Sequence, residues 1–259
     1  MRWTTAANLA VIERAMRFAS ARGAQVYVFS ELAVTGFHRQ IRAEAVPEKV
    51  GPAVASIRAA CKALGLACAL GAPTFAAAGG AVYNSYLHID EHGELVGQVD
   101  KTGQTPAEAT FFHGGRGRPV SMLQGWKTSA VLCREVEDLA LVRIHLPKGA
   151  AELVFWPGAM GKAPENREET WVDVLPLAQQ LARQSNAWVV QNNWPNALNN
   201  PPHSPDSRHL GGSKVFSPEG ELRLSLPMHD AGIATFDLGA TAFVWDAWPD
   251  SDPQPDPTA

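Results

Sequence analysis

Three predicted strands end at side chains that together could break a carbon–nitrogen bond. The segments AQVYVFSEL, ELVGQVDK and WKTSAVLC lead to Glu31, Lys101 and Cys133. Splitting such a bond requires a nucleophile, a base that deprotonates it, a charge that stabilises the oxyanion and an acid for the departing amine. A thiol, a carboxylate and an ammonium group can fill these roles. Each residue alone also fits an ordinary structural role, because a cysteine in an apolar strand is usually core and a lysine near a turn is usually solvated.

The sequence around these residues resembles the nitrilase (carbon–nitrogen hydrolase) superfamily along nearly the whole chain. GAQVYVFSELAVTGF is similar to the element with the family's catalytic Glu, VDKTGQTPAEATFFHGG to the block with its Lys and second Glu, and SAVLCREVED to its nucleophile block. GAAELVFWPGA, LARQSNAWVVQNN and GGSKVFSPEGEL resemble later family elements in the expected order. The resemblance implies that Glu31, Lys101, Glu108 and Cys133 are catalytic, and it places the family's acidic residue two positions after the nucleophile at Glu135.

The implied activity is hydrolysis of a carbon–nitrogen bond other than a peptide bond. Cys133 would attack an amide carbonyl or a nitrile carbon and form a thioester or thioimidate, with Glu31 as base. Lys101 and the backbone N–H of Arg134 would stabilise the oxyanion, and Glu108 would orient Lys101, the substrate or the incoming water. An amide is the expected substrate and a nitrile the nearest alternative, since the same residues serve both. The mechanism requires no metal and no cofactor, and the substrate-binding residues stay unassigned.

Three departures from the family pattern leave a second class of function open. Arg134 stands where an aromatic residue is usual, and Val136-Glu137-Asp138 stands where Pro-Glu is expected. The chain also begins at the family's first helix, which predicts that the opening strand is missing; we expect the encoded protein to extend upstream of Met1 or to have been shortened from an ancestor that did. These departures would fit a catalytically silent binding or scaffold protein. Retention of two carboxylates and a cation with the thiol argues against that alternative.

Alternating helices and strands position these side chains. The near-helical spacing of Leu9, Ile12, Met16 and Phe18 predicts a helix over 8–22, which Gly23 ends. The patterns further predict helices over 54–64 and 170–184, strands over 66–72 and 187–194, and hairpins turning at 92–93 and 218–220. Residues 139–159 predict a short helix, a turn and a strand. Residues 102–119 contain Pro, Gly and Thr throughout and predict a long ordered loop, of the kind that often lines a site.

The resemblance implies an α/β fold in which two sheets pack face to face between outer helices, an αββα sandwich, often paired into a homodimer or higher oligomer. We expect residues 1–247 to form one carbon–nitrogen hydrolase domain. Residues 248–259, WPDSDPQPDPTA, are acidic and rich in Pro, and predict a tail or partner-contacting arm.

Composition and cysteine content indicate which partners and which cellular compartment to expect. A net charge of −4 and scattered Lys and Arg give no support for nucleic acid or an anionic membrane as partner. The resemblance implies a small-molecule amide or nitrile as the binding partner. The three cysteines cannot form a closed disulfide framework, and no signal peptide is recognisable, so we expect a cytoplasmic protein. The eight histidines give no zinc-binding spacing, and His38, His113 and His209 are left out of the predicted site.

Overall fold

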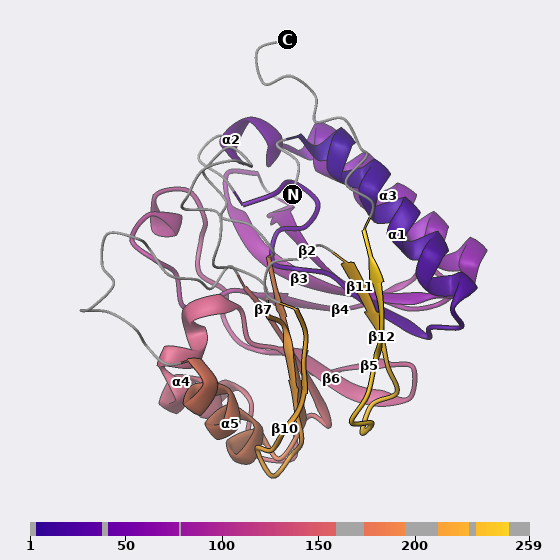
Figure 1. Cartoon of the computed structure of the whole chain (residues 1–259). Helices are drawn as coiled ribbons and strands as arrows, with labels where there is room; N and C mark the ends of the chain where they lie inside the picture. Colours follow the sequence, from indigo (N-terminus) through magenta and orange to yellow (C-terminus); the bar gives the residue numbers. More distant parts are fainter. Residues whose placement is uncertain are drawn as a thin grey trace, which may run out of the picture.

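Two sheets stacked between helices dominate the computed structural model (Figure 1), which describes residues 4–37, 41–77, 79–158, 174–194, 212–227 and 232–248. One sheet has four strands in the order β1-β2-β3-β4, and the other has six in the order β10-β9-β8-β7-β6-β5. Strands β11 (Gly232–Thr235) and β12 (Val244–Ala247) form a separate antiparallel pair.

The four-stranded sheet carries the first half of the chain. Strand β1 (Val26–Val28) runs parallel to β2 (Ala67–Phe75), and β2, β3 (Val82–Ile89) and β4 (Leu95–Asp100) are antiparallel neighbours. The predicted hairpin is therefore present as β3 and β4, with Lys101 directly after its last strand. Strand β1 is half-buried at the sheet edge: Val26 and Val28 face the cluster between the sheets, Tyr27 faces the apolar cluster under the helices that cover this sheet, and one side of the strand has no neighbouring strand in the sheet.

The six-stranded sheet carries the second half. Its centre consists of the parallel strands β6 (Trp126–Ala130), β7 (Leu153–Gly158) and β8 (Trp188–Asn193). Strand β5 (Ser121–Leu123) pairs with β6 at one edge, and β9 (Lys214–Phe216) and β10 (Leu222–Ser225) form the predicted hairpin at the other. The strand predicted to reach Cys133 ends earlier, at Ala130, and Cys133 opens the 3-10 helix η2 (Cys133–Glu137).

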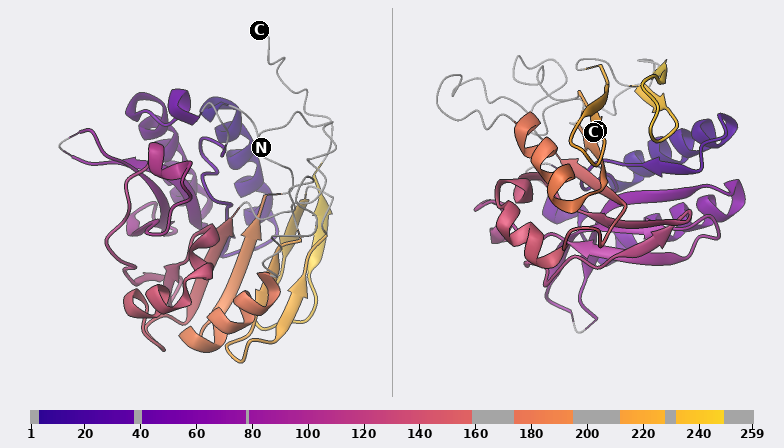
Figure 2. Two further views of the ribbon diagram at one scale, coloured as in Figure 1. Left: turned by 90° about the vertical axis from the view of Figure 1, so that its left-hand side faces the viewer. Right: turned by 90° about the horizontal axis from the view of Figure 1, so that it is seen from below.

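Helices cover the outer face of each sheet, as Figure 2 shows from two further sides. Helices α1 (Thr5–Ala21) and α3 (Pro47–Leu64) pack on the four-stranded sheet through an apolar cluster that includes Met16, Ile57 and Leu70. Helices α4 (Leu139–His145) and α5 (Val174–Ser185) pack on the six-stranded sheet. A third cluster, with Tyr86 and Phe155, lies between the sheets. This is the predicted αββα sandwich.

Helices α1, α3 and α5 are present where the sequence predicted helices, but α3 begins at Pro47, seven residues before the predicted start. The Thr4 hydroxyl accepts the N–H of Ala7 and starts α1, and Gly23 follows its end with a φ of 75°. Asp138 starts α4 by accepting the N–H of Leu141, so the turn that lacks the family's Pro-Glu is closed by a side-chain cap. The short helix α2 (Ile41–Glu44) was not predicted.

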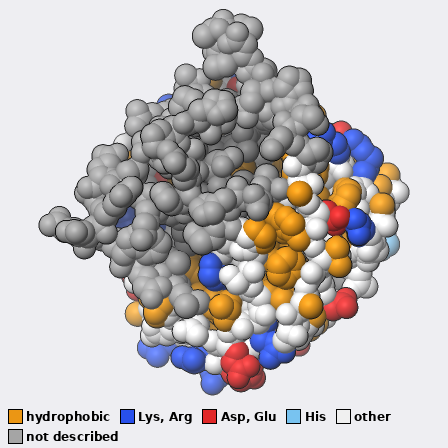
Figure 3. All heavy atoms as spheres, in the orientation of Figure 1, with side chains coloured by type: hydrophobic (Ala, Val, Ile, Leu, Met, Phe, Trp, Pro, Cys, Tyr) orange, Lys and Arg blue, Asp and Glu red, His pale blue; other side chains and the backbone are white. Residues whose placement is uncertain are grey.

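Figure 3 shows apolar side chains gathered where β11 and β12 lie, and Val244 of β12 is among the exposed apolar residues. None of the helices in the described ranges has both the length and the apolar character that crossing a bilayer requires. Residues 1–3 and 249–259 lie outside the described residues, so the expectations for the chain start and for the tail stay predictions.

Candidate active site

Glu31 lies in the turn that follows β1, and strand β2 holds that turn in place. The Val34 N–H donates to the Gly71 carbonyl at 3.1 Å, and the indole N–H of Trp194 donates to the Glu31 carbonyl at 2.9 Å. A Cβ on Gly71 would lie 2.3 Å from the backbone nitrogen of Leu32, so only glycine permits this approach. The backbone of Glu31 is thus fixed from two sides.

Lys101 is fully buried and lies between two carboxylates. Its Nζ donates to Oε1 of Glu31 at 2.8 Å and to Oε1 of Glu108 at 2.7 Å. Its backbone N–H donates to the Asn84 carbonyl on β3 at 2.8 Å, which continues the hairpin pairing by one residue. A lysine this deeply buried requires charged partners, and the two carboxylates provide them.

Glu108 is the first residue of the 3-10 helix η1 (Glu108–Thr110), inside the predicted long loop. Its Oε2 accepts the Thr105 N–H at 2.8 Å, and its own N–H donates to the Thr105 hydroxyl at 3.1 Å, a reciprocal cap that fixes the carboxylate. The other oxygen is left to face Lys101.

Asn84 joins the two carboxylates and was missed by the sequence analysis. Its Nδ2 donates to Oε1 of Glu31 at 2.8 Å and to Oε1 of Glu108 at 3.3 Å. In the sequence Asn84 is one polar residue of a strand, and its partners lie 53 and 24 positions away, so no local pattern could reveal the contact.

The charges in this cluster shift each other's proton affinities. Burial raises the pKa of Glu31, and the Glu108 charge raises it further, while Lys101 opposes both. Burial lowers the pKa of Lys101, but the charges of Glu31, Cys133 and Glu108 outweigh it and raise that pKa above its ordinary value. Lys101 therefore stays a cation. Oε2 of Glu31 is buried and has no hydrogen-bond partner among the described residues, so it is available to accept a proton.

Cys133 adopts a backbone conformation that is rare for a residue with a side chain. Its φ is 49°, in the left-handed region, which costs roughly 1–2 kcal/mol for a non-glycine residue. The Trp156 indole N–H donates to the Cys133 carbonyl at 2.9 Å from the neighbouring strand β7 and helps to hold this turn. Strained backbone of this kind is concentrated at functional sites, and here it occurs at the predicted nucleophile.

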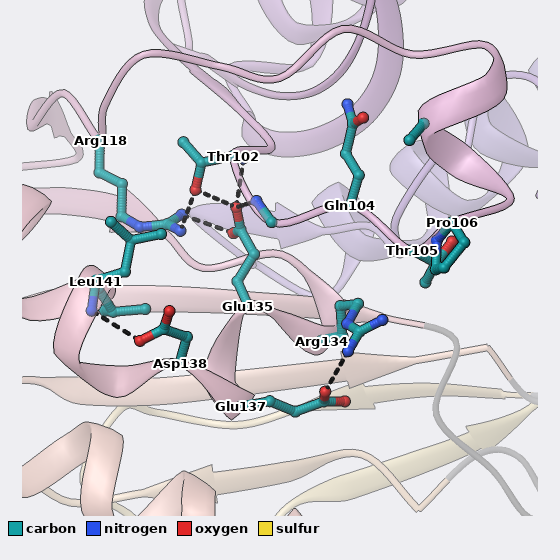
Figure 4. Close-up of a pocket in the computed structure, with 13 residues that line it drawn as sticks. Thr102, Gln104, Thr105, Pro106, Arg118, Arg134, Glu135, Glu137, Asp138 and Leu141 are labelled. Atoms are coloured by element: carbon teal, nitrogen blue, oxygen red, sulfur yellow. Dashed lines mark hydrogen bonds and ion pairs between the residues drawn. The ribbon is translucent and has the colours of Figure 1, made fainter.

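The structure brings the predicted residues together from both sheets. Glu31, Lys101 and Glu108 are in direct contact, and Cys133 is near enough for its charge to act on Lys101. Arg134, the residue after Cys133, turns its side chain to Glu137 at 2.8 Å. A cavity of about 560 Å³ opens next to Arg134 (Figure 4). It lies between residues 102–106 and the segment from η2 to the start of α4. Its lining does not include the four predicted catalytic residues Glu31, Lys101, Glu108 and Cys133.

Thiol labelling should single out Cys133. Cys61 and Cys68 are fully buried in the cluster under α3, whereas Cys133 is partly exposed and close enough to Lys101 for their charges to interact. Partly exposed cysteines near a cation are in general the reactive ones. We expect one equivalent of iodoacetamide to react with the native protein, at Cys133, as measured by intact mass and peptide mapping. Faster labelling of Cys61 or Cys68 in the folded protein would contradict this assignment.

Comparisons with known proteins show what this chain is similar to. The carbon–nitrogen hydrolase family model matches residues 1–242. N-carbamoylputrescine amidase of Arabidopsis thaliana is 29% identical over 170 residues, which are 62% of this chain and 56% of that protein, so the match spans little more than half of the relative.

Two solved structures of an amidase from Nesterenkonia sp. AN1 are also similar. One is a glutamate-to-glutamine variant with the acetamide moiety of fluoroacetamide added covalently at its active-site cysteine. It is 25% identical to this chain, and the two structures match with a TM-score of 0.73 over 88% of this chain and 82% of the amidase chain. A cysteine-to-alanine variant in complex with butyramide is 25% identical, also with a TM-score of 0.73, covering 88% and 83%.

Proposed function

This chain belongs to the carbon–nitrogen hydrolase family, and on that premise we propose that it hydrolyses a small amide through a thioester on Cys133. The observation that carries the proposal is the buried Lys101, held between Glu31 and Glu108 and close enough to Cys133 for their charges to interact. A fixed cation beside a thiol favours both the thiolate and the oxyanion that forms when the thiolate attacks a carbonyl.

Acylation begins with a proton transfer. Glu31 takes the Cys133 proton, and the thiolate attacks the amide carbon to give a tetrahedral oxyanion. The Lys101 ammonium and the backbone N–H of Arg134 stabilise this oxyanion; N–H groups in the first turn of a helix such as η2 have no partner within the helix. The carbon–nitrogen bond then breaks, and the leaving amine takes the proton from Glu31.

Deacylation repeats the chemistry with water. Glu31 removes a proton from the water, which attacks the thioester carbon. The Cys133–carbon bond then breaks to release a carboxylic acid, and Glu31 returns the proton to the Cys133 sulfur. Glu108 is assigned to orienting Lys101 and the substrate, because its carboxylate is already fixed by Thr105 and Lys101. The site has two carboxylates and one ammonium group around the thiol, so its total charge is small, which suits an uncharged reacting group.

An amide is favoured over a nitrile because the similar proteins are amidases, one of them in complex with butyramide. We expect short aliphatic amides and N-carbamoyl compounds to be hydrolysed with release of ammonia, and the corresponding nitriles to react at least about tenfold more slowly. Ammonia release and product mass, measured over matched amide and nitrile panels, test this. Faster turnover of the nitriles would replace amidase with nitrilase.

A silent scaffold remains the alternative of another class. It predicts a folded protein with no turnover on either panel and no rate advantage of Cys133 over free cysteine towards electrophiles. The buried Lys101 argues against it, because a scaffold has no need for a desolvated cation beside a thiol.

We further propose that residues 1–247 act as one catalytic domain, in the cytoplasm and as a homodimer. Three cysteines without a disulfide suit a reducing compartment. Ile144 on the outer helix α4 is 71% exposed, which suits an apolar contact between subunits. Sedimentation at micromolar concentration tests the assembly; a monomer with full activity would remove the homodimer from the proposal.

A further inference from the structure

We propose that Glu135 is a positioning residue that fixes the spacing between Lys101 and Cys133. The inference rests on the proposed function and deepens it by assigning a further residue to the same site. Glu135 does not contact the reacting groups itself; it acts through the backbone of the residues next to them.

One carboxylate ties the two halves of the site together. Oε1 of Glu135 accepts the N–H of Thr102 at 2.5 Å and the N–H of Gly103 at 2.9 Å. Oε2 accepts the N–H of Leu132 at 2.6 Å. Thr102 directly follows Lys101, and Leu132 directly precedes Cys133. The chain segment with the cation and the segment with the nucleophile are therefore joined by a single side chain.

The contacts also explain why a carboxylate is required. The Thr102 hydroxyl donates to Oε1 at 2.8 Å, and Nη1 of Arg118 donates to Oε2 at 2.6 Å (Figure 4). All five partners of Glu135 are donors, so the amide group of a glutamine would turn its own N–H groups towards other donors in either orientation. Burial raises the pKa of Glu135, but Arg118 and the backbone N–H groups outweigh it and lower that pKa, so the charge persists.

Glu135 also holds the strained turn at the nucleophile. The Leu132 N–H bond fixes the residue before Cys133, and the Trp156 indole fixes the Cys133 carbonyl. These two contacts lie on either side of the residue whose φ is 49°. Without the Glu135 contact, the backbone before Cys133 is free to relax away from this conformation, and the thiol moves relative to Lys101.

The expected defect is in chemistry rather than in substrate binding. Lys101 keeps its contacts with Glu31 and Glu108, so the cation stays in the site while its distance to the Cys133 sulfur changes. A thiolate that loses a close cation is less stable, so its reactivity should appear only at higher pH. Because less thiolate is then present at neutral pH, the activation free energy for acylation rises as well.

The test compares Glu135→Gln with Asp90→Asn. Asp90 is the matched control because its carboxylate accepts the N–H groups of His92 and Glu94 in the turn at the opposite end of the β3–β4 hairpin from Lys101. Two readouts are taken on folded protein: the rate of Cys133 alkylation by iodoacetamide against pH, and kcat and KM for the best amide. For Glu135→Gln we expect the alkylation midpoint to rise by about one pH unit and kcat to fall about 30-fold or more, with KM changed less than threefold. Asp90→Asn should match wild type in both.

Wild-type alkylation and kcat in folded Glu135→Gln would overturn the proposal and leave Glu135 a role in stability alone. If Glu135→Gln does not fold, Thr102→Val decides, since it removes the hydroxyl that Glu135 and Arg118 share; a smaller shift in the same direction supports the proposal, and wild-type values overturn it. If wild type hydrolyses no amide or nitrile, the proposed function fails while the alkylation profile still tests Glu135.

Discussion

Replacing Cys133 by alanine is expected to abolish amide hydrolysis while leaving the fold intact. Loss of the nucleophile removes the covalent route altogether, and in another hydrolase such a loss has cost about 10⁶ in kcat. The side chain is small and partly exposed, so little packing is lost, and alanine adopts the left-handed conformation at a cost similar to that for cysteine. Initial rates of ammonia release, together with thermal unfolding, measure both effects.

Cys133→Ser extends this test, because a hydroxyl in the same place is a much weaker nucleophile than a thiolate at neutral pH. It should be almost as inactive as the alanine variant. The double variant Cys61→Ala and Cys68→Ala supplies the control, since both thiols are buried away from the site and should be dispensable for turnover even if stability falls. Activity near that of wild type in Cys133→Ala would rule out the thioester mechanism.

The second large effect is expected from Glu31→Gln, with a loss of kcat of about 10³-fold or more. General bases typically contribute 10²–10⁴-fold, and this one acts in both acylation and deacylation. Because burial raises the pKa of Glu31, the wild-type acid limb of kcat/KM should lie above the ordinary carboxyl range, with activity lost as pH falls through it. The limb should be absent from the residual activity of Glu31→Gln.

Lys101→Met provides the comparison, and we expect its loss of activity to be no larger than that of Glu31→Gln. The two variants differ in stability. Glutamine is isosteric and leaves the Lys101–Glu108 pair in place, whereas methionine leaves two carboxylates buried without their cation, a change that typically costs about 3–5 kcal/mol. Rates must therefore be referred to folded protein, measured by circular dichroism. Full activity in either folded variant would remove that residue from the site.

Local patterns predicted much of the architecture. Helix α1, the β3–β4 and β9–β10 hairpins, and strands β2, β7 and β8 have clear periodicity and turn residues at their ends. The predicted catalytic residues came from family motifs around Glu31, Lys101, Glu108 and Cys133, and the structure groups them as one cluster. The αββα arrangement followed from the same resemblance.

The parts that were not predicted depend on distant contacts. The apolar run SAVLC has the composition of a strand, but the chain turns at Cys133 instead, where the distant Trp156 indole binds the Cys133 carbonyl and Glu135 caps the turn locally at the Leu132 N–H. Asn84 belongs to the site only because residues on two other segments lie beside it. The short pair β11–β12 lacks a strong alternating pattern, since it covers an edge of the molecule and only Ile233 is buried.

The division of the site between two sheets also has a kinetic consequence. Glu31, Lys101 and Glu108 belong to the half of the chain that builds the four-stranded sheet, and Cys133 follows a strand of the other sheet. During refolding, each hairpin and helix can form from residues close in sequence, but the nucleophile meets its cation only when the two sheets dock. Contacts between residues far apart in sequence form late, because the entropy of closing long loops must be overcome first. Recovery of activity after dilution from denaturant therefore reports the docking of the sheets, and should lag behind the recovery of secondary structure.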